Sequence, residues 1–265
     1  VKTLELVKPA LDGKNLVPIF ACFTFTPGSV TAYNDTIAIT GPSELEETCA
    51  IHGNTLLGML TNTSAEEVSI ELDSQNAILT AGKSVTKLPF ETEENFLFEE
   101  PTGKWALKIP YTESLHEAML LCLETVSTDE TQQALHGVTI EGNKLYSCNG
   151  DTITRVTIKE KSGTRYLMPT AFCEAVTKLW SSLKVTKGTL QFNDEWIFAN
   201  FEDWAVYGRV LVVDKPINFD DLIKRTVKAK TPTQGVPGAL AEALSRARVL
   251  ADPESQKTEI TVAKN

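Results

Sequence analysis

The chain has 265 residues and a formal net charge of −10, with 42% hydrophobic and 23% charged residues. This composition is typical of a folded protein with room for two compact modules, and the acidity argues against binding of nucleic acid through a simple basic patch. No apolar run reaches the ~18 residues that span a bilayer and no signal segment is present, so the sequence predicts a cytoplasmic protein with no membrane partner.

The first part of the chain predicts a helix, a strand pair, a second helix and a run of strands, in that order. The helices are expected at Lys2–Leu11 and Gly53–Leu60. The strand pair is expected within Phe23–Thr40, and alternating strands within Glu67–Phe90. Together these elements describe one compact module.

The same order of elements then recurs. The second copy consists of a helix, a strand pair, a helix and strands, at Ser114–Val126, Val138–Ile158, Pro169–Leu183 and Gly188–Val213. The tripeptide Asp35-Thr36-Ile37 returns as Asp151-Thr152-Ile153, 116 positions later. Repeats of this length are domains rather than solenoid units, because each buries its own core.

A third copy begins near the C-terminus. Thr231–Pro237 is rich in proline and glycine and predicts a linker, and Gly238–Ala251 predicts another opening helix, followed by a strand-like segment at Thr258–Ala263. This copy stops about 80 residues short of a full repeat. We therefore predict four segments, which are a module at 1–103, a module at 104–225, a linker at 226–237 and the start of a possible third module at 238–265.

The cysteines do not predict a disulfide or zinc framework. They are odd in number, lie mostly in apolar runs and show no metal-ligand spacing; they are Cys22, Cys49, Cys122, Cys148 and Cys173. We expect five reduced core residues.

The search for catalytic chemistry finds no motif, and the sequence predicts no enzyme activity, metal or cofactor. The histidines His52, His116 and His136 lack ligand spacing. The segment Ala77–Ser84 (AILTAGKS) resembles a phosphate-binding loop but lacks its first glycine and leads into a strand-like run rather than a helix. Asp35 and Asp151 follow Asn or Gly between strands, which favours a role in turns.

Charge is distributed unevenly along the chain. Acidic residues crowd 44–47, 91–100 and 214–221, whereas basic residues gather at 178–187 and again at 224–248. An acidic protein with one basic face can bind a phosphate backbone loosely and without reading bases. The alternative is that these lysines and arginines are ordinary solvated surface.

Several segments resemble the bacterial replicative sliding clamp, the β processivity subunit of DNA polymerase III. In Gln132–Val156, Leu135 and Gly137 match the family's leucine-x-glycine, and Asp151 matches the aspartate of its alanine-threonine-aspartate-glycine-histidine-arginine motif. Gly150 replaces the threonine, and Thr152, Ile153 and Thr154 replace the last three residues. Three further segments are similar to the clamp's first loop and strand, the end of its second domain and the first helix of its third, at Asp12–Phe25, Tyr207–Ile223 and Gly238–Ala251.

The resemblance implies a divergent clamp, of a kind that phages encode. It implies an α+β fold of repeated clamp modules, each with two helices packed on antiparallel sheets. The implied partners are double-stranded DNA without sequence preference, DNA polymerase, a clamp loader and further copies of the chain in a ring. Lys14 matches the family's basic loop residue, and the other candidate DNA-binding residues are Lys178, Lys184, Lys2, Lys8 and Arg246.

The family's partner-peptide groove maps to positions in the same motif region. The matching residues here are Leu135, Gly150, Thr152, Ile153, Thr154 and Arg155. Leu135 and Ile153 would form an apolar floor, and the missing histidine-arginine pair implies a different cognate peptide. The alternative is that Leu135 and Ile153 are simply core.

Two questions stay open at this level. Clamp rings contain six modules, so a three-module subunit, which the incomplete third copy favours, implies two subunits per ring, whereas a two-module subunit implies three. Two other functions also remain: a two-lobed β-rich enzyme with Asp35, Asp151 and His136 as its polar centre, and a ring-forming structural protein of a virion.

Overall fold

The computed structural model describes residues 1–13, 17–129, 131–226 and 238–250. The chain divides into two compact units, Val1–Ile217 and Asn218–Asn265. In the described residues, no helix is both long and apolar enough to cross a membrane.

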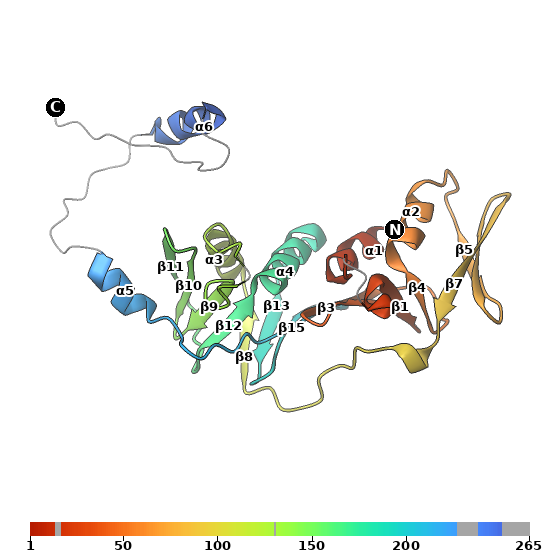
Figure 1. The fold of residues 1–265 in the computed structure, drawn as a ribbon, viewed down its shortest axis with the longest axis horizontal. Coiled ribbons are helices and arrows are strands. Elements are labelled where there is room, and N and C mark those ends of the chain that lie inside the picture. Colours follow the sequence, from red (N-terminus) through yellow and green to blue (C-terminus); the bar gives the residue numbers. More distant parts are fainter. Residues whose placement is uncertain (14–16, 130, 227–237, 251–265) are drawn as a thin grey trace. The chain divides into compact units, whose positions relative to one another are not determined.

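Figure 1 shows the helices and strands, coloured in chain order. The α-helices are α1 (Lys2–Val7), α2 (Gly53–Thr61), α3 (Glu113–Leu123), α4 (Thr170–Leu183), α5 (Phe219–Thr226) and α6 (Leu240–Leu250). The strands of the first half of unit 1 are β1 (Cys22–Thr26), β2 (Ser29–Tyr33), β3 (Ile37–Pro42), β4 (Cys49–His52), β5 (Ser69–Leu72), β6 (Asn76–Ala81) and β7 (Ser84–Glu91). Those of the second half are β8 (Leu107–Tyr111), β9 (Gly137–Glu141), β10 (Lys144–Cys148), β11 (Ile153–Thr157), β12 (Tyr166–Pro169), β13 (Gly188–Phe192), β14 (Trp196–Phe201) and β15 (Trp204–Arg209).

The strands form two sheets, with antiparallel pairing throughout the registers of the described strands. The larger has 11 strands in the order β5-β6-β7-β4-β1-β2-β3-β15-β14-β13-β8, and the smaller has the order β11-β10-β9-β12. Helices α1 to α4 lie along one face of these sheets (Figure 1). The predicted α+β class with antiparallel sheets is therefore confirmed.

The repeat predicted from sequence is present, with more strands than expected. Each predicted strand pair contains three strands, and β4, β8 and β12 were not predicted at all. The second half contains two motifs, β8-α3-β9-β10-β11 and β12-α4-β13-β14-β15. β8 pairs with β13 of the second motif, and β12 pairs with β9 of the first. Each sheet of that half therefore contains three strands from one motif and the first strand of the other.

The same side-chain turn closes four hairpins. Asn34 Oδ1 accepts hydrogen bonds from the amides of Thr36 and Ile37, and Asn149 Oδ1 accepts them from Asp151 and Thr152. Asp73 and Asn193 do the same in the β5–β6 and β13–β14 hairpins. An Asn or Asp side chain that bonds its own backbone in this way is a turn-forming device.

These turns correct the predicted alignment of the tripeptide repeat by one position. Asp35 has φ 71° and Gly150 has φ 96°, and each directly follows the turn-forming asparagine. Asp35 is thus the counterpart of Gly150, and Thr36 that of Asp151. The interpretation of both aspartates as turn residues agrees with this geometry.

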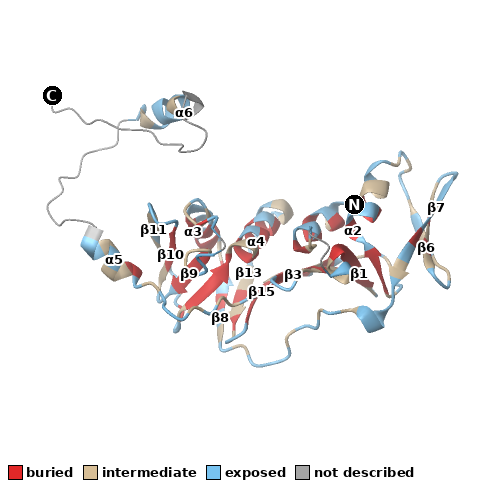
Figure 2. Ribbon diagram, in the orientation of Figure 1, coloured by how far each residue is buried: buried red, intermediate tan, exposed pale blue. Residues whose placement is uncertain are grey.

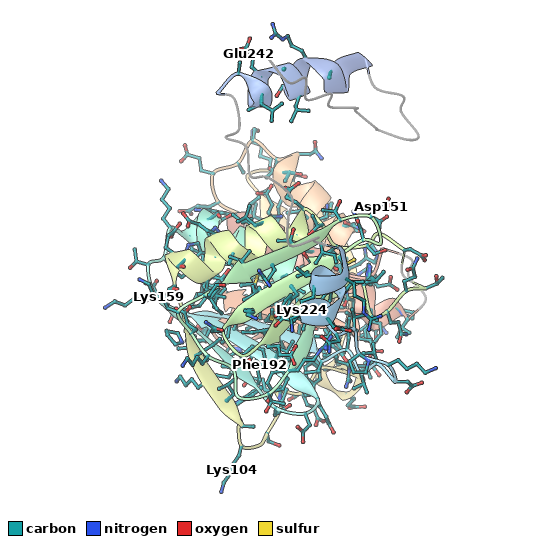
Figure 3. All side chains as sticks on the ribbon, turned by 90° about the vertical axis from the view of Figure 1, so that its left-hand side faces the viewer. Lys104, Asp151, Lys159, Phe192, Lys224 and Glu242 are labelled. Atoms are coloured by element: carbon teal, nitrogen blue, oxygen red, sulfur yellow. The ribbon has the colours of Figure 1, made fainter. Side chains whose placement is uncertain are left out.

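Buried side chains concentrate between the helices and the sheets (Figure 2). Figure 3 shows Phe192 inside the fold, whereas Asp151 lies on a peripheral turn. All five cysteines are buried free thiols, as predicted, and burial raises the pKa of the Cys22, Cys49 and Cys122 thiols to about 11.

The two halves of unit 1 are joined through backbone pairing of β3 with β15. Ile37 to Thr40 pair with Gly208 to Ala205. Arg209 extends the junction, because its Nε donates to Asp35 O at 3.0 Å and its guanidinium lies 4.5 Å from the Trp196 ring.

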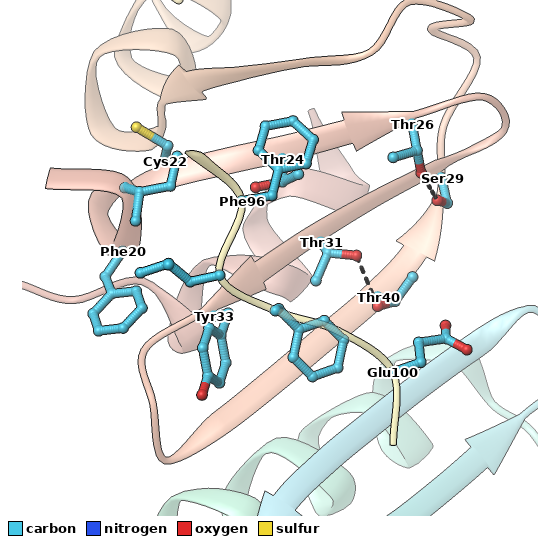
Figure 4. A pocket seen from close by; sticks show the side chains of 13 residues that line it. Phe20, Cys22, Thr24, Thr26, Ser29, Thr31, Tyr33, Thr40, Phe96 and Glu100 are labelled. Carbon is cyan, nitrogen blue, oxygen red and sulfur yellow. Dashed lines mark hydrogen bonds between the residues drawn. The ribbon is translucent and has the colours of Figure 1, made fainter. Parts of the chain in front are cut away.

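The connection between the halves crosses the other face of the sheet as a strap (residues 92–106). Phe98 lies 5.1 Å from Tyr33, 5.2 Å from Tyr207 and 6.3 Å from Trp196, between ring centroids. Farther along, Trp105 stacks on Phe198 at 5.5 Å. These rings therefore contact both halves and stabilise the junction. Beneath the strap lies a pocket of about 180 Å³. Figure 4 shows the hydroxyl side chains of β1, β2 and β3 that line it, of which Thr31 and Thr40 bond each other.

Candidate nucleic-acid and partner surfaces

Three of the predicted DNA-binding residues surround one cleft in the helix layer. Lys2 and Lys8 come from α1 and the 3-10 turn Lys8–Ala10, and Lys178 comes from α4. The cleft has a volume of about 490 Å³ and is also lined by Glu5, Leu6, Leu57 and Ser182. The structure thus brings together lysines that are separated by about 170 positions and belong to both halves of unit 1.

The pattern of each helix explains why its lysines face outward. In α4 the apolar residues Cys173, Val176 and Trp180 are buried, and Lys178 lies on the opposite, exposed stripe. In α1 the residues Leu4 and Val7 are buried, and Lys2 and Lys8 are exposed. Amphipathic helices on a sheet leave their polar face to solvent in this way.

The cleft carries a positive charge excess. Among the described residues, Lys2, Lys8 and Lys178 form no ion pair, and Glu5 is the one acidic residue in the lining. Two net positive charges at a solvated surface attract a phosphate backbone without binding it tightly.

The remaining predicted DNA-binding residues have separate outcomes. Lys184 is exposed and ends α4 in a left-handed conformation with φ 55°. Arg246 lies on α6 in unit 2, where its guanidinium is 3.6 Å from the Glu242 carboxylate. Lys14 lies outside the described residues. The roles of all six residues stay predictions.

The predicted partner residues lie around the β10–β11 turn and the loop before β9. Gly150 and Thr152 belong to the turn, and Ile153, Thr154 and Arg155 begin β11. Leu135 and Ile153 are half-buried. Neither side chain is part of the apolar core of the described chain, so their alternative role as core residues is weakened.

The segment after α3 holds both parts of this surface. Thr125 Oγ1 donates to Thr154 Oγ1 at 2.8 Å and is 2.6 Å from Ser147 Oγ. Two residues later, the Ser127 amide donates to Leu135 O at 3.1 Å. Leu135 and Thr154 are therefore anchored to the same short segment, which fixes Leu135 relative to the start of β11.

The residues of the alternative polar centre are not brought together. Asp35 lies in the β2–β3 turn of the large sheet and contacts Arg209, whereas Asp151 lies in the β10–β11 turn of the small sheet. His136 Nδ1 is 3.0 Å from Ser127 O, in the loop before β9. The described residues also contain no group of three His, Cys, Asp or Glu side chains that could hold a metal ion.

The phosphate-loop resemblance fails for the expected reason. Gly82 has φ 61° in the β6–β7 turn, and the chain continues into strand β7. A loop that leads into a strand does not present helix N-terminal amides to a phosphate.

Sequence reasoning missed the strap and the pocket beneath it. Phe96, Leu97 and Phe98 line that pocket together with Glu100. The available signal was the occurrence of aromatic residues in a segment without regular periodicity, since such rings need a surface on which to pack.

Comparison with solved structures identifies the architecture. The chain superposes on the DNA polymerase III β sliding clamp of Bartonella birtlesii, solved with griselimycin, with a TM-score of 0.82 and 16% identity over 96% of this chain and 73% of the other. This chain has the sliding-clamp fold. The clamp of Caulobacter crescentus gives a TM-score of 0.79 at 16% identity, over 95% and 73% of the two chains. The β clamp of Helicobacter pylori, solved with a DNA ligase peptide, gives 0.69 at 13% identity, over 86% and 67%.

The sliding-clamp resemblance inferred from scattered motifs is confirmed at the level of the fold. No family model matches the sequence, and no curated protein matches it. An identity of 13–17% to the solved clamps agrees with a divergent member of this fold.

Proposed function

We propose that this protein is a DNA sliding clamp, a non-enzymatic ring that encircles duplex DNA and tethers a replicative polymerase. The observation that carries the proposal is the cleft between α1 and α4. There, three lysines from both halves of unit 1 lie on the helix face, and the sheet behind them is continuous across the boundary.

The charge balance suits this function. A ring threaded by DNA is retained by its closed shape, so it needs only weak phosphate contacts, and tight ones would stop it sliding. A net charge of −10 repels DNA from the rest of the surface.

Ring closure is supported by the strand edges. Within unit 1, β3, the last strand of the β1-β2-β3 run, pairs with β15, the last strand of the β13-β14-β15 run. β3 corresponds to β11 of the second half, which is an end strand of the small sheet. β15 corresponds to β7 of the first half, which pairs with β4 only at Phe90 and Glu91. We propose that the β11 edge continues into a β15-type strand of the next module, and that the β7 edge accepts a β3-type strand of the preceding one. Such heterologous contacts close head to tail.

We propose the modules as 1–103, 104–225 and, after a linker at 226–237, the start of a third at 238–265. We further propose that polymerase and clamp loader bind through short apolar peptides over Leu135 and Ile153. The clamp of Helicobacter pylori was solved with a DNA ligase peptide. Half-buried aliphatic side chains beside an edge strand suit such a peptide.

Primer extension on a long singly primed circular template tests the clamp function. Addition of the protein with its cognate polymerase and loader should lengthen the products. Unchanged product length with a loader that binds the protein would contradict the proposal, and a virion protein would show no DNA-dependent partner at all.

A substitution tests the peptide surface separately. Leu135→Asp should abolish binding of the polymerase tail peptide, because a buried carboxylate replaces an apolar anchor. The melting temperature should change little, and Leu120→Asp, at a leucine that is 44% exposed on α3, is the matched control. A large loss of stability in Leu135→Asp would instead assign Leu135 to the core.

A further inference from the structure

The face of β1, β2 and β3 that is turned away from the helices carries a cluster of hydroxyl side chains. Alternate residues of these strands, such as Val30 and Ile39, are buried in the core. The residues between them point to the opposite face. There, strand pairing places Thr24 beside Thr31 and Thr31 beside Thr40. The hydroxyl face is defined here as Thr24, Thr26, Ser29, Thr31 and Thr40.

An apolar part of the strap covers the hydroxyl face. Phe96, Leu97 and Phe98 line the pocket of about 180 Å³ together with these hydroxyl side chains. Farther along, the strap meets a ring instead, since Trp105 stacks on Phe198 at 5.5 Å. Direct packing of apolar side chains on hydroxyl groups is unfavourable, because a hydroxyl that is buried without a hydrogen bond costs free energy. The pocket therefore lies where strap and sheet are chemically mismatched.

The pocket has the size of a single substituted ring. A cavity of about 150 Å³ takes up benzene, so about 180 Å³ leaves room for one ring with a short chain. Phe20 and Tyr33 also line the pocket, with their ring centroids 5.3 Å apart in an edge-to-face arrangement. Figure 4 shows these two rings on one side of the pocket and Glu100 on the other. Leu97 in the lining is 53% exposed, so the pocket reaches solvent.

The hydroxyl face keeps hydrogen-bonding capacity for a ligand. Thr31 Oγ1 lies 2.9 Å from Thr40 Oγ1, and Thr26 Oγ1 lies 2.7 Å from Ser29 Oγ. Each such pair uses one of its two hydroxyl protons, and the other proton can be donated to a third group. A ligand with an acceptor oxygen on the edge that meets this face would accept that proton.

The side of the pocket opposite the two rings is acidic. Glu100 is exposed and forms no ion pair with any described residue. Burial raises the pKa of Tyr207, and the Glu100 carboxylate raises it further, so the Tyr207 hydroxyl stays protonated and donates to Glu100. This bond orients the carboxylate and leaves its other lone pairs for a cation. Further exposed carboxylates on the same strap are Glu93, Glu94 and Glu99.

We propose that this pocket binds a small phenolic amine, which is an aromatic ring that carries a hydroxyl group and, on a short chain, a protonated amine. The ring lies between the strap and the hydroxyl face, the ligand hydroxyl bonds that face, and the ammonium group pairs with Glu100. The aromatic side chains around the pocket also favour a cation over an anion. The site lies on the other side of the sheet from the lysine cleft and does not depend on the proposed clamp function.

Three probes test this chemistry in ligand-observed NMR titrations of the whole chain. Tyramine should bind saturably with a Kd of about 1 mM or below. Phenethylamine, which lacks the hydroxyl group, should bind about fivefold more weakly. The neutral phenol p-cresol, which lacks the amine, should bind about tenfold more weakly than tyramine. Amide hydrogen exchange locates the site, and tyramine should slow exchange in residues 96–100.

Two variants assign the contacts to side chains. Thr24→Val, Thr31→Val, Thr40→Val keeps the shape of the hydroxyl face and removes the threonine hydroxyls that pair across it. This variant should bind tyramine about fivefold more weakly and phenethylamine unchanged. Glu100→Gln should weaken binding of both amines about tenfold and leave p-cresol unchanged. The matched controls, which should bind tyramine as the parent does, are Glu99→Gln and, at half-buried strand positions outside the pocket, Thr80→Val, Thr86→Val, Thr189→Val.

Four results would overturn the proposal. They are the absence of saturable tyramine binding up to about 10 mM, equal affinity of the parent for tyramine and phenethylamine, equal tyramine affinity of Glu100→Gln and Glu99→Gln, and slowed exchange confined to segments away from the pocket. Melting curves accompany each titration. If the threonine variant does not fold, the probe series and Glu100→Gln still decide between these outcomes.

Discussion

Removal of the three lysines around the α1–α4 cleft should weaken DNA binding in a way that salt reveals. The variant Lys2→Ala, Lys8→Ala, Lys178→Ala deletes the positive side chains that line this cleft and leaves Glu5 in place. All three side chains are exposed, so we expect the melting temperature to change little.

The magnitude follows from counterion release. Each phosphate that a lysine neutralises contributes about 0.9 to the slope of log affinity against log salt, so three lysines contribute at most about 2.7. At 0.1 M salt this corresponds to a loss of affinity for linear duplex of up to about 500-fold. Partial, water-separated contacts would give a smaller loss with the same sign.

The assay is a salt titration of binding to short linear duplex, with a matched variant that removes the same charge elsewhere. Lys104→Ala, Lys108→Ala, Lys159→Ala serves this purpose, because these side chains are exposed and lie outside the cleft. Figure 3 shows Lys104 near the tip of the chain before β8. Equal slopes in the two triple variants would refute the assignment of the cleft.

Three further predictions concern stability. Phe98→Ala should lower the free energy of unfolding by about 1–3 kcal/mol in a denaturant titration, because it removes ring contacts across the junction. Leu97→Ala, at the exposed neighbouring residue, should lower it by less than about 0.5 kcal/mol in the same titration. Gly208→Ala should lower the free energy of unfolding by about 1–3 kcal/mol, since its Cβ would lie 2.7 Å from Phe172 Cδ2. The Cβ of Gly58→Ala in α2 would meet nothing within 4 Å, so this variant should raise the free energy of unfolding by about 0.5–1 kcal/mol, and equal effects of the two variants in calorimetry would contradict this reasoning. Burial lowers the pKa of His116, so between the folded and unfolded pKa values the unfolded chain binds more protons than the folded chain. Stability should therefore be complete above about pH 7 and fall as pH drops through the unfolded pKa of about 6.5, and His116→Gln should flatten this dependence in melting curves; an unchanged pH dependence in His116→Gln would contradict it.

The helices of unit 1 were predictable because each carries a clear apolar stripe. The expected Pro169–Leu183 and Gly53–Leu60 differ from α4 and α2 by one residue at one end. The expected Lys2–Leu11 and Ser114–Val126 were too long, because α1 ends at Val7 and α3 ends at Leu123. The short strands were not predictable, because β8 and β12 have only five and four residues and each contains a proline. Helix α5 was also missed, although Asn218 Oδ1 accepts from the Asp221 amide as a helix cap.

The candidate surfaces were predictable as residues but not as groups. Lys2, Lys8 and Lys178 were singled out individually, and the β3–β15 pairing joins the two halves that carry them. The strand exchange of β8 and β12 was equally invisible, because it joins residues about 80 and 30 positions apart with no local signal. Topology, rather than residue type, carried the missing information.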